Sequence, residues 1–166
     1  MEGKFWYVLQ VKFGSEKRVG KNLGKAGFEV CVPTQKETHQ WSDRKKRVEV
    51  AIFCGYVFVC IASQEKSKVF IEKNIFCYVK LCGKVCILQA EDMDLIKKLG
   101  LVGEGVKISC EKVGKGSVVE ILGGVLVGFR GIVKDAESGA KIRIMIANLN
   151  CFAEVVLENV PIKLII

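Results

Sequence analysis

The chain has 166 residues, of which 50% are hydrophobic and 27% charged, with 17 Gly and only 2 Pro. This composition excludes collagenous and disordered proteins, and the length suits one ordinary domain or two small ones. The longest apolar run, residues 50–62, is shorter than the roughly 20 residues of a membrane-spanning helix. No secretory leader precedes the first strand pattern, so we expect a cytoplasmic protein whose eight Cys are free thiols.

The net charge of +8 is concentrated near the start of the chain. Residues 12–47 hold ten Lys or Arg and only four Asp or Glu. A basic segment of this kind is typical of a solvated surface, or of a surface that binds a polyanion such as nucleic acid. The charge alone leaves both interpretations open.

The first two predicted elements are a strand and a short helix. Residues 5–13 are rich in aromatic and β-branched side chains, which favours a strand. Ser15 is a candidate N-cap and Gly27 a candidate C-terminal cap for the helix between them, whose apolar side chains fall on one face. On one side of this helix, lysines recur at every fourth position: Lys17, Lys21 and Lys25.

A long hairpin is the next prediction. Residues 28–61 have a strand pattern that is interrupted by the polar segment SDRKKR at 42–47. This segment suits the tip of a hairpin with strands near residues 30–41 and 48–51. The apolar sequence GYVFVCI at 55–61 predicts a buried strand directly after the hairpin.

The remaining pattern changes from mixed to all-β. Residues 63–72 are polar and helical in character, 76–88 predict a strand, and 90–99 have the apolar spacing of a short helix. Glycines then mark a connection, after which short runs such as SVVEI, GVLVGF and KIRIMI are separated by Gly. We predict an α+β protein with an antiparallel sheet flanked by helices in residues 1–100, a linker in 101–111 and a small five-stranded β-barrel in 112–166.

No catalytic or metal-binding pattern is evident. His39 is the only His, and it lies in a polar stretch without a nucleophile or metal-ligand motif around it. The densest Cys group, formed by Cys77, Cys82 and Cys86, has no CxxC spacing and no His partner. We therefore expect neither an enzyme nor a cofactor or metal.

Aromatic residues are concentrated in the predicted first domain. Twelve of the 14 Phe, Trp and Tyr precede residue 100. Tyr56 and Phe58 share one face of their predicted strand, because side chains alternate along a strand. Such a group is either ordinary core or an aromatic patch on the open face of a sheet, and the sequence pattern leaves both open.

Four segments resemble a known family. WYVLQVKFGSEKRV at 6–19, VPTQKE at 32–37 and FCGYVFV at 53–59 resemble the N-terminal domain of NusG-type transcription elongation factors. GSVVEILGGVLVGFRGIVKD at 116–135 resembles the KOW module that follows it in that family. Cys54 stands where the family usually has Pro, and Val125 replaces the Pro of the KOW turn, which indicates a divergent paralogue.

This resemblance implies a monomeric elongation or antitermination factor that binds the clamp helices of RNA polymerase and increases processivity. The second domain would be an SH3-like KOW barrel that recruits a ribosomal protein or a termination factor. DNA near the transcription bubble would be a further partner, and nascent RNA is a second candidate there. The alternative is a free RNA-binding or ribosome-associated KOW protein, and the choice between a general factor and an operon-specific antiterminator stays open.

The resemblance and the residue patterns together give three sets of candidate site residues. The polymerase-binding set consists of Trp6, Tyr7, Phe53, Tyr56 and Phe58. The nucleic-acid-binding set consists of Lys12, Lys17, Arg18, Lys21, Lys25, Arg44, Lys45, Lys46 and Arg47. The KOW partner set, flanked by glycines, consists of Leu126, Phe129 and Arg130, although a Phe at this position is equally suited to closing the end of the barrel.

Overall fold

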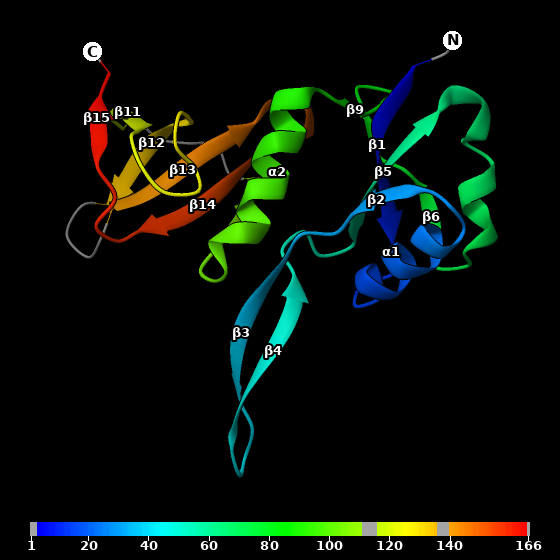
Figure 1. Ribbon diagram of the computed structural model, residues 1–166, viewed down its shortest axis with the longest axis horizontal. Coiled ribbons are helices and arrows are strands. Elements are labelled where there is room, and N and C mark those ends of the chain that lie inside the picture. Colours follow the sequence, from blue (N-terminus) through cyan, green and yellow to red (C-terminus); the bar gives the residue numbers. More distant parts are fainter. Residues whose placement is uncertain (1–2, 111–115, 136–139, 166) are drawn as a thin grey trace.

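The computed structural model describes residues 3–110, 116–135 and 140–165 (Figure 1). Two antiparallel sheets lie on either side of a helix, and a two-stranded hairpin extends away from the rest of the molecule. No helix in these described ranges is long and apolar enough to cross a membrane. The predicted start of the C-terminal domain, residue 112, lies outside the described residues.

The N-terminal sheet is built around the predicted first strand. Here β1 (Lys4–Val11) lies between β5 (Tyr56–Ala62) and β6 (Ile75–Tyr78), while β2 (Glu29–Cys31) and β9 (Ile87–Leu88) complete a sheet of five strands. Every pairing in this sheet is antiparallel. The antiparallel sheet predicted for the first domain is therefore present.

One face of this sheet is covered by the predicted first helix, α1 (Glu16–Lys25). Val19 and Leu23 of α1 are buried against a cluster that includes Tyr7 and Leu9 of β1. This apolar stripe, spaced for one helical face, holds α1 on the sheet. The lysines and the arginine of α1 are thereby left toward solvent, whereas Glu16 at its start is buried.

The hairpin consists of β3 (Thr34–Gln40) and β4 (Lys45–Ala51), paired over seven registered positions. It extends from the body of the molecule (Figure 1). The turn is shorter than predicted, because the Trp41 N–H donates to the Arg44 carbonyl at 2.9 Å and leaves two residues between them. Three basic residues predicted to lie at the tip therefore lie in β4.

The base of the hairpin is anchored by Gln35, which is 7% exposed. Its amide Nε2 donates to the Val106 carbonyl at 2.9 Å, and its Oε1 accepts from the Val106 N–H at 2.9 Å. Two hydrogen bonds on one buried side chain satisfy both ends of the amide. The hairpin is thereby tied to the segment that leads into the C-terminal sheet.

Between β5 and α2, the predicted helix and strand are shorter and more broken than expected. The polar segment 63–72 forms two 3-10 helices, η1 (Ser63–Glu65) and η2 (Lys68–Ile71). The predicted strand 76–88 is divided among β6, β7 (Lys80–Leu81), β8 (Lys84–Val85) and β9. Cys82 and Gly83 cause one of these breaks, because their φ angles of 50° and 78° form a turn.

Helix α2 (Ala90–Val102) connects the two sheets. Its Ile96 and Leu99 belong to one buried cluster with Val8 and Phe58 of the N-terminal sheet. The same cluster continues into Ile144 and Ala153 of the C-terminal sheet. The two sheets therefore share a core across α2. Residues 101–102 of the predicted linker belong to this helix.

The C-terminal sheet contains six strands in the order β10-β14-β13-β12-β11-β15. Their bounds are β10 (Lys107–Ser109), β11 (Val118–Ile121), β12 (Arg130–Asp135), β13 (Ala140–Ile146), β14 (Cys151–Leu157) and β15 (Ile162–Leu164), with η3 (Ala147–Leu149) between β13 and β14. The strand-rich pattern expected for this half of the chain is confirmed.

The predicted five-stranded barrel is corrected in two respects. The sixth strand, β10, comes from the predicted linker and pairs with β14. The sheet does not close into a barrel, since β10 and β15 lie at opposite ends of the strand order among the described residues.

One predicted strand in this half, GVLVGF at 124–129, is a turn instead. Gly124 and Gly128 have φ angles of 73° and 86°, which interrupt an extended strand. The Gly128 N–H donates to the Ile121 carbonyl at 2.8 Å. The segment therefore folds back on β11.

Candidate functional site

Phe53 and Tyr56 flank the turn that leads from the hairpin into β5. The turn is made at Gly55, whose φ of 82° favours glycine. The Gly55 N–H donates to Glu16 Oε1 at 2.6 Å, and the same oxygen accepts from the Gly14 N–H at 3.1 Å. Because Glu16 is buried at the start of α1, it fixes the turn that presents Tyr56.

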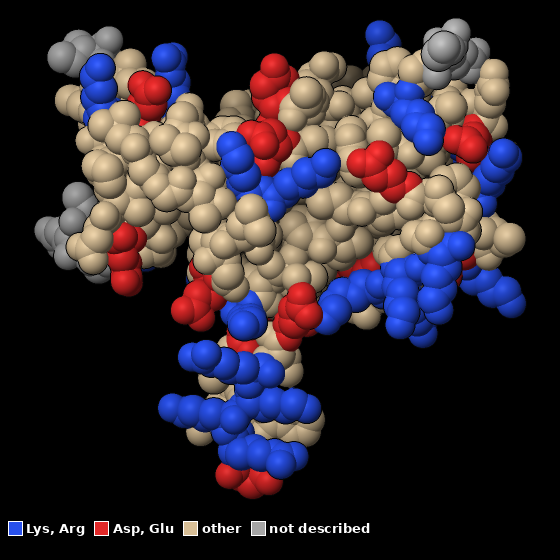
Figure 2. All heavy atoms as spheres, viewed as in Figure 1, with Lys and Arg blue, Asp and Glu red and all other residues tan. Residues whose placement is uncertain are grey.

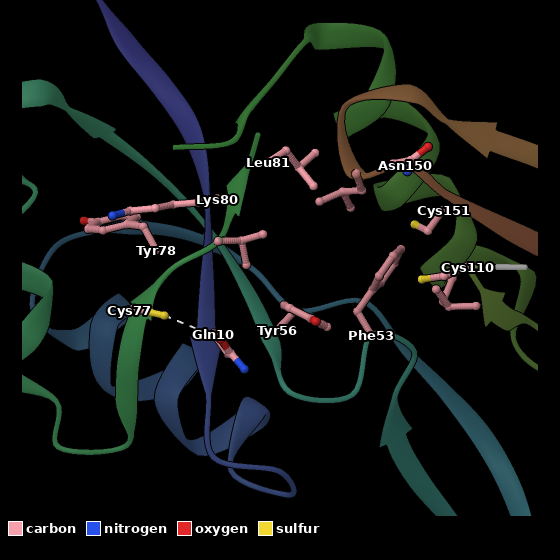
Figure 3. Close-up of a pocket in the computed structure, with 13 residues that line it drawn as sticks. Gln10, Phe53, Tyr56, Cys77, Tyr78, Lys80, Leu81, Cys110, Asn150 and Cys151 are labelled. Atoms are coloured by element: carbon pink, nitrogen blue, oxygen red, sulfur yellow. Dashed lines mark hydrogen bonds between the residues drawn. The ribbon is translucent and has the colours of Figure 1, made fainter. Parts of the chain in front are cut away.

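A cavity of about 650 Å³ lies between this turn and the C-terminal sheet. Phe53 and Tyr56 line it from the N-terminal side, and Ile108 and Cys151 line it from the C-terminal side (Figure 3). Phe53 is 4% exposed and Tyr56 is 39% exposed. The cavity therefore presents one buried and one accessible aromatic ring at the boundary between the two sheets.

A second cavity, of about 690 Å³, lies beside the base of the hairpin. It shares Phe53 and Tyr56 with the first cavity and adds Phe13, His39 and Val50. Phe13 is 77% exposed, which is unusual for a large apolar side chain. The two cavities thus form one apolar groove centred on Phe53 and Tyr56, which we call the aromatic groove.

The five aromatic residues predicted to form one binding patch do not share a surface. The register pairs Phe58 with Val8, so Tyr7 lies on the opposite face of the sheet. Tyr7 and Phe58 are both buried, and Phe58 packs edge-to-face on Phe53 with ring centroids 5.1 Å apart. Trp6 is half-buried against the shared core. Of the five residues predicted to bind polymerase, Phe53 and Tyr56 therefore line the groove, and the other three lie in or against the core.

All nine predicted nucleic-acid-binding residues are exposed. Figure 2 shows their basic side chains gathered over the hairpin and over α1. Between these two elements, Lys17 Nζ lies 3.4 Å from Glu49 Oε2 and donates to the Glu49 carbonyl at 3.2 Å. The hydrogen bond from the Thr34 hydroxyl, and then the contact with Lys17, lower the pKa of the Glu49 carboxyl. This pair joins the two basic surfaces.

A family model described as "Transcription termination factor nusG" matches residues 4–97. The chain belongs to the NusG family. The match covers the N-terminal sheet, the hairpin and most of α2, so the elements that build the aromatic groove from the N-terminal side are family elements.

Curated relatives of the same name extend beyond that match. The chain is 26% identical to the transcription termination/antitermination protein NusG of Streptococcus pyogenes serotype M1, over 96% of this chain and 93% of the relative. It is 26% identical to NusG of Bacillus subtilis (strain 168), over 81% and 82% of the two chains. It is 28% identical to NusG of Chlamydia trachomatis serovar D, over 78% and 77%.

A solved structure described as "Domain interaction in Thermotoga maritima NusG" has a similar fold. It matches with a TM-score of 0.63 at 23% sequence identity, and it covers 96% of both chains. The similarity therefore extends through the C-terminal sheet as well as the NusG domain.

The three predicted KOW partner residues differ in accessibility. Leu126 is 2% exposed and belongs to the shared core, and Phe129 is partly buried against it. Lys98 of α2 lies with its Nζ 5.0 Å from the centroid of the Phe129 ring. Arg130 is exposed. Phe129 thus contributes to the contact between the halves of this NusG-family chain, and Arg130 remains accessible.

Burial raises the pKa of two thiols, Cys86 and Cys151. Burial, and then the neighbouring Cys110, raise the pKa of the Cys151 thiol to about 12. Burial also raises the pKa of Cys86, whose Sγ donates to the Asn148 carbonyl at 2.8 Å. In the described ranges, no group of three His, Cys, Asp or Glu side chains is placed to hold a metal ion.

Sequence reasoning did not single out Glu16, Phe13 or Trp41. Glu16 stands within the segment that resembles the NusG domain, but its bond to a turn 39 residues away depends on the tertiary fold. The residue pattern predicts Phe13 at the end of a strand, whereas β1 ends at Val11. The residue pattern predicts Trp41 at the end of a strand, and only the register shows that it lies next to the hairpin turn.

Proposed function

We propose that this chain is a non-enzymatic transcription factor that binds RNA polymerase through the aromatic groove and acts in termination or antitermination. The observation that carries the proposal is the half-exposed ring of Tyr56, which lines both cavities beside the nearly buried Phe53. A few aromatic side chains in a pocket commonly supply most of the energy of a protein interface. An apolar groove of this kind suits an amphipathic helix, and the clamp helices of the polymerase would supply it.

The C-terminal sheet limits access to this groove. Ile108 and Cys151 line the same cavity as Phe53 and Tyr56, and the shared core continues from one sheet to the other. A partner that fills the cavity would therefore displace the C-terminal sheet from the N-terminal one. The name of the Thermotoga maritima structure refers to a domain interaction in that protein. The described arrangement is, on this proposal, the closed form of the chain.

The basic surface of α1 and the hairpin would contact DNA near the transcription bubble, and nascent RNA is the second candidate there. Phosphate contacts by Lys and Arg position a protein without reading the base sequence. Charge reversal at Lys21 and Lys46, both exposed, should weaken the DNA contact of an elongation complex and leave polymerase binding nearly unchanged. If DNA contact and polymerase binding were weakened equally, the two partners would not have separate surfaces.

The C-terminal sheet would recruit a further protein, such as a ribosomal protein or a termination factor. Arg130 is exposed, and the adjacent turn carries Val125 and Val127, which are 41% and 50% exposed. We assign the recruiting surface to this turn, because Leu126 is buried and Phe129 contacts α2. A titration of the full chain with a candidate partner, followed by the amide signals of residues 125–130, tests the assignment.

Capture of core RNA polymerase by the purified chain tests the central proposal. Tyr56→Ala should lower the affinity by about 2 kcal/mol, or roughly 30-fold. Phe76→Ala is the matched control, because Phe76 is 62% exposed on β6 and does not line either cavity. Unchanged polymerase binding by a folded Tyr56→Ala protein would reject the groove. Capture of ribosomal subunits but not of polymerase would support a ribosome-associated protein instead.

A further inference from the structure

The register of the hairpin separates its side chains into two faces. Directly opposite residues of an antiparallel pair point to the same face, and successive residues alternate. His39 pairs with Lys46, and the next rung on the same face joins Trp41 to Arg44 at the turn. We call these four side chains the tryptophan face.

The opposite face carries a different set of side chains. Gln40 pairs with Lys45, and Thr38 pairs with Arg47. This face continues toward Glu49, which holds Lys17 of α1. It therefore extends the basic surface of α1, and it lacks an aromatic residue at these rungs.

The tryptophan face combines a flat ring with cations. Trp41 is 57% exposed, and His39, Arg44 and Lys46 are exposed as well. An indole ring that is exposed to water is unfavourable and adds nothing to a core. Stacking of the same ring on a nucleotide base stabilises a complex by about 1–3 kcal/mol. Neighbouring cations bind the phosphates on either side of a stacked base. This combination suits unpaired nucleotides.

A duplex would not use this face in the same way. Bases in a duplex are stacked on one another and offer only their edges in the grooves. The Trp41 ring can stack only on a base that is free of its own neighbours. Rungs on one face of a strand lie about 7 Å apart, so the two rungs can contact adjacent nucleotides of an extended strand.

Toward the base of the hairpin, the tryptophan face ends at an acidic residue. Glu37 lies on the same side of β3, and its carboxylate oxygen lies 3.5 Å from His39 Nε2. A carboxylate repels phosphate, so a bound strand would be confined to the outer half of the hairpin. Seven residues of β3 place this outer half about 20 Å along the arm, away from the sheets.

We propose that the tryptophan face binds single-stranded DNA, with Trp41 stacking on one base and Arg44 and Lys46 contacting the flanking phosphates. The proposal deepens the proposed function, because it assigns the nucleic-acid contact to one face of one element and to one strandedness. Stacking on a base and contacts with phosphates do not require a ribose 2′-hydroxyl, and the proposed function brings this chain close to the DNA of the transcription bubble. DNA is therefore the assigned strand.

The test measures binding of the full chain to free labelled oligonucleotides, without polymerase. The probes are a 12-nucleotide single strand of mixed sequence, the same sequence as RNA, and the DNA duplex. Trp41→Ala should weaken binding of single-stranded DNA by roughly 5- to 100-fold and change duplex binding by less than twofold. Trp41→Phe should recover part of the loss, because a phenyl ring also stacks.

Two neighbouring lysines provide the matched control. Lys45 and Lys46 carry the same charge at consecutive positions but lie on opposite faces. Lys46→Ala should therefore weaken single-stranded DNA binding more than Lys45→Ala does. Bound single strand should quench tryptophan fluorescence in the wild type, and this quenching should disappear in Trp41→Phe, which retains only Trp6.

Several results would overturn the proposal. These are unchanged single-strand affinity in Trp41→Ala, equal losses for single strand and duplex, or equal effects of the two lysine changes. Tighter binding of the RNA strand with the same dependence on Trp41 would overturn the assignment to DNA. Because polymerase is absent from these measurements, a negative oligonucleotide result does not affect the test of the aromatic groove. Unchanged polymerase binding by Tyr56→Ala would likewise say nothing about the affinity for oligonucleotides.

Discussion

The carboxylate of Glu16 accepts a hydrogen bond of 2.6 Å from the backbone N–H of Gly55, and this contact joins the first helix to the turn that presents Tyr56. The same oxygen accepts from the Gly14 N–H. Glu16 therefore satisfies two backbone donors that lie far apart in sequence. The shape of the aromatic groove depends on a residue outside the groove.

Removal of this carboxylate should destabilise the fold. Glu16→Ala leaves two partly buried N–H groups without their acceptor, at a cost of about 1–3 kcal/mol for an unsatisfied group. We expect a lower free energy of unfolding in urea and weaker polymerase capture. Glu16→Gln keeps an oxygen acceptor at the same position and should retain most of the stability. If the two variants lose the same free energy of unfolding, the negative charge of Glu16 matters rather than its hydrogen-bond acceptor.

Two glycines of α1 should respond in opposite directions to alanine. A Cβ on Gly24 would meet nothing within 4 Å, whereas a Cβ on Gly20 would lie 2.6 Å from Val32 Cγ2. Gly24→Ala should therefore stabilise the chain by about 0.5–1 kcal/mol through helix propensity and a less flexible unfolded state. Gly20→Ala should destabilise it, since α1 must move away from Val32. Thermal unfolding of both variants measures the difference, and the same sign in both would contradict this packing.

The sequence predicted those elements whose signals are local. β1, α1 and α2 followed from residue type, apolar spacing and caps within one window of sequence. Ser15 occupies the N-cap position, although its hydroxyl donates to the Lys12 carbonyl instead of capping the helix. Gly27 adopts the left-handed φ of 91° expected just beyond a helix end.

The groove could not be predicted in full, because it depends on pairing between distant strands. Alternation along β5 correctly placed Tyr56 and Phe58 on one face. It gave no register against β1, so it could not show that Tyr7 lies on the other face. Likewise, β10 was assigned to a linker, because three residues carry little strand signal until β14 pairs with them.

Buried neutral groups predict a loss of stability at high pH. The Cys151 thiol has its pKa raised from 9.0 to about 12 by burial, and Tyr78 has its pKa raised from 10.0 to about 12, also by burial. Well below pH 9 both groups are neutral in the folded and unfolded chain. Between pH 9 and pH 12 the unfolded chain loses these protons first, so unfolding becomes more favourable as the pH rises.

The thermal midpoint measured from pH 8 upward checks this sign. It should fall as the pH passes 9, and the fall should be shallower in Cys151→Ala, even though that variant is less stable overall. Val155→Ala is the control, because it removes buried apolar atoms from the same strand but no thiol, so it should lower the midpoint without changing its slope against pH. A midpoint that stays constant or rises over this range would contradict the burial of Cys151.

The contact between the two sheets should control access to the aromatic groove. Cys86 Sγ donates to the Asn148 carbonyl across this boundary, and Phe129 packs on the shared core beside Lys98. Truncation of Phe129 should favour separation of the sheets. If Phe129→Ala weakens the closed form by about 1 kcal/mol, the open population rises roughly fivefold while it remains small. Both the alkylation rate of Cys86 and the affinity for polymerase should then increase.

Alkylation of the full chain, with mass-spectrometric mapping of each thiol, separates this opening from general unfolding. Cys60 is buried in the N-terminal sheet, so its alkylation should accelerate only if the whole domain unfolds. Val127→Ala is the matched variant, because Val127 is 50% exposed in the same turn. Its truncation should leave both the alkylation rate of Cys86 and the affinity for polymerase unchanged. Faster Cys86 alkylation without tighter polymerase binding would show that the C-terminal sheet does not limit access to the groove. An unchanged Cys86 rate would show that Phe129 does not hold the sheets together.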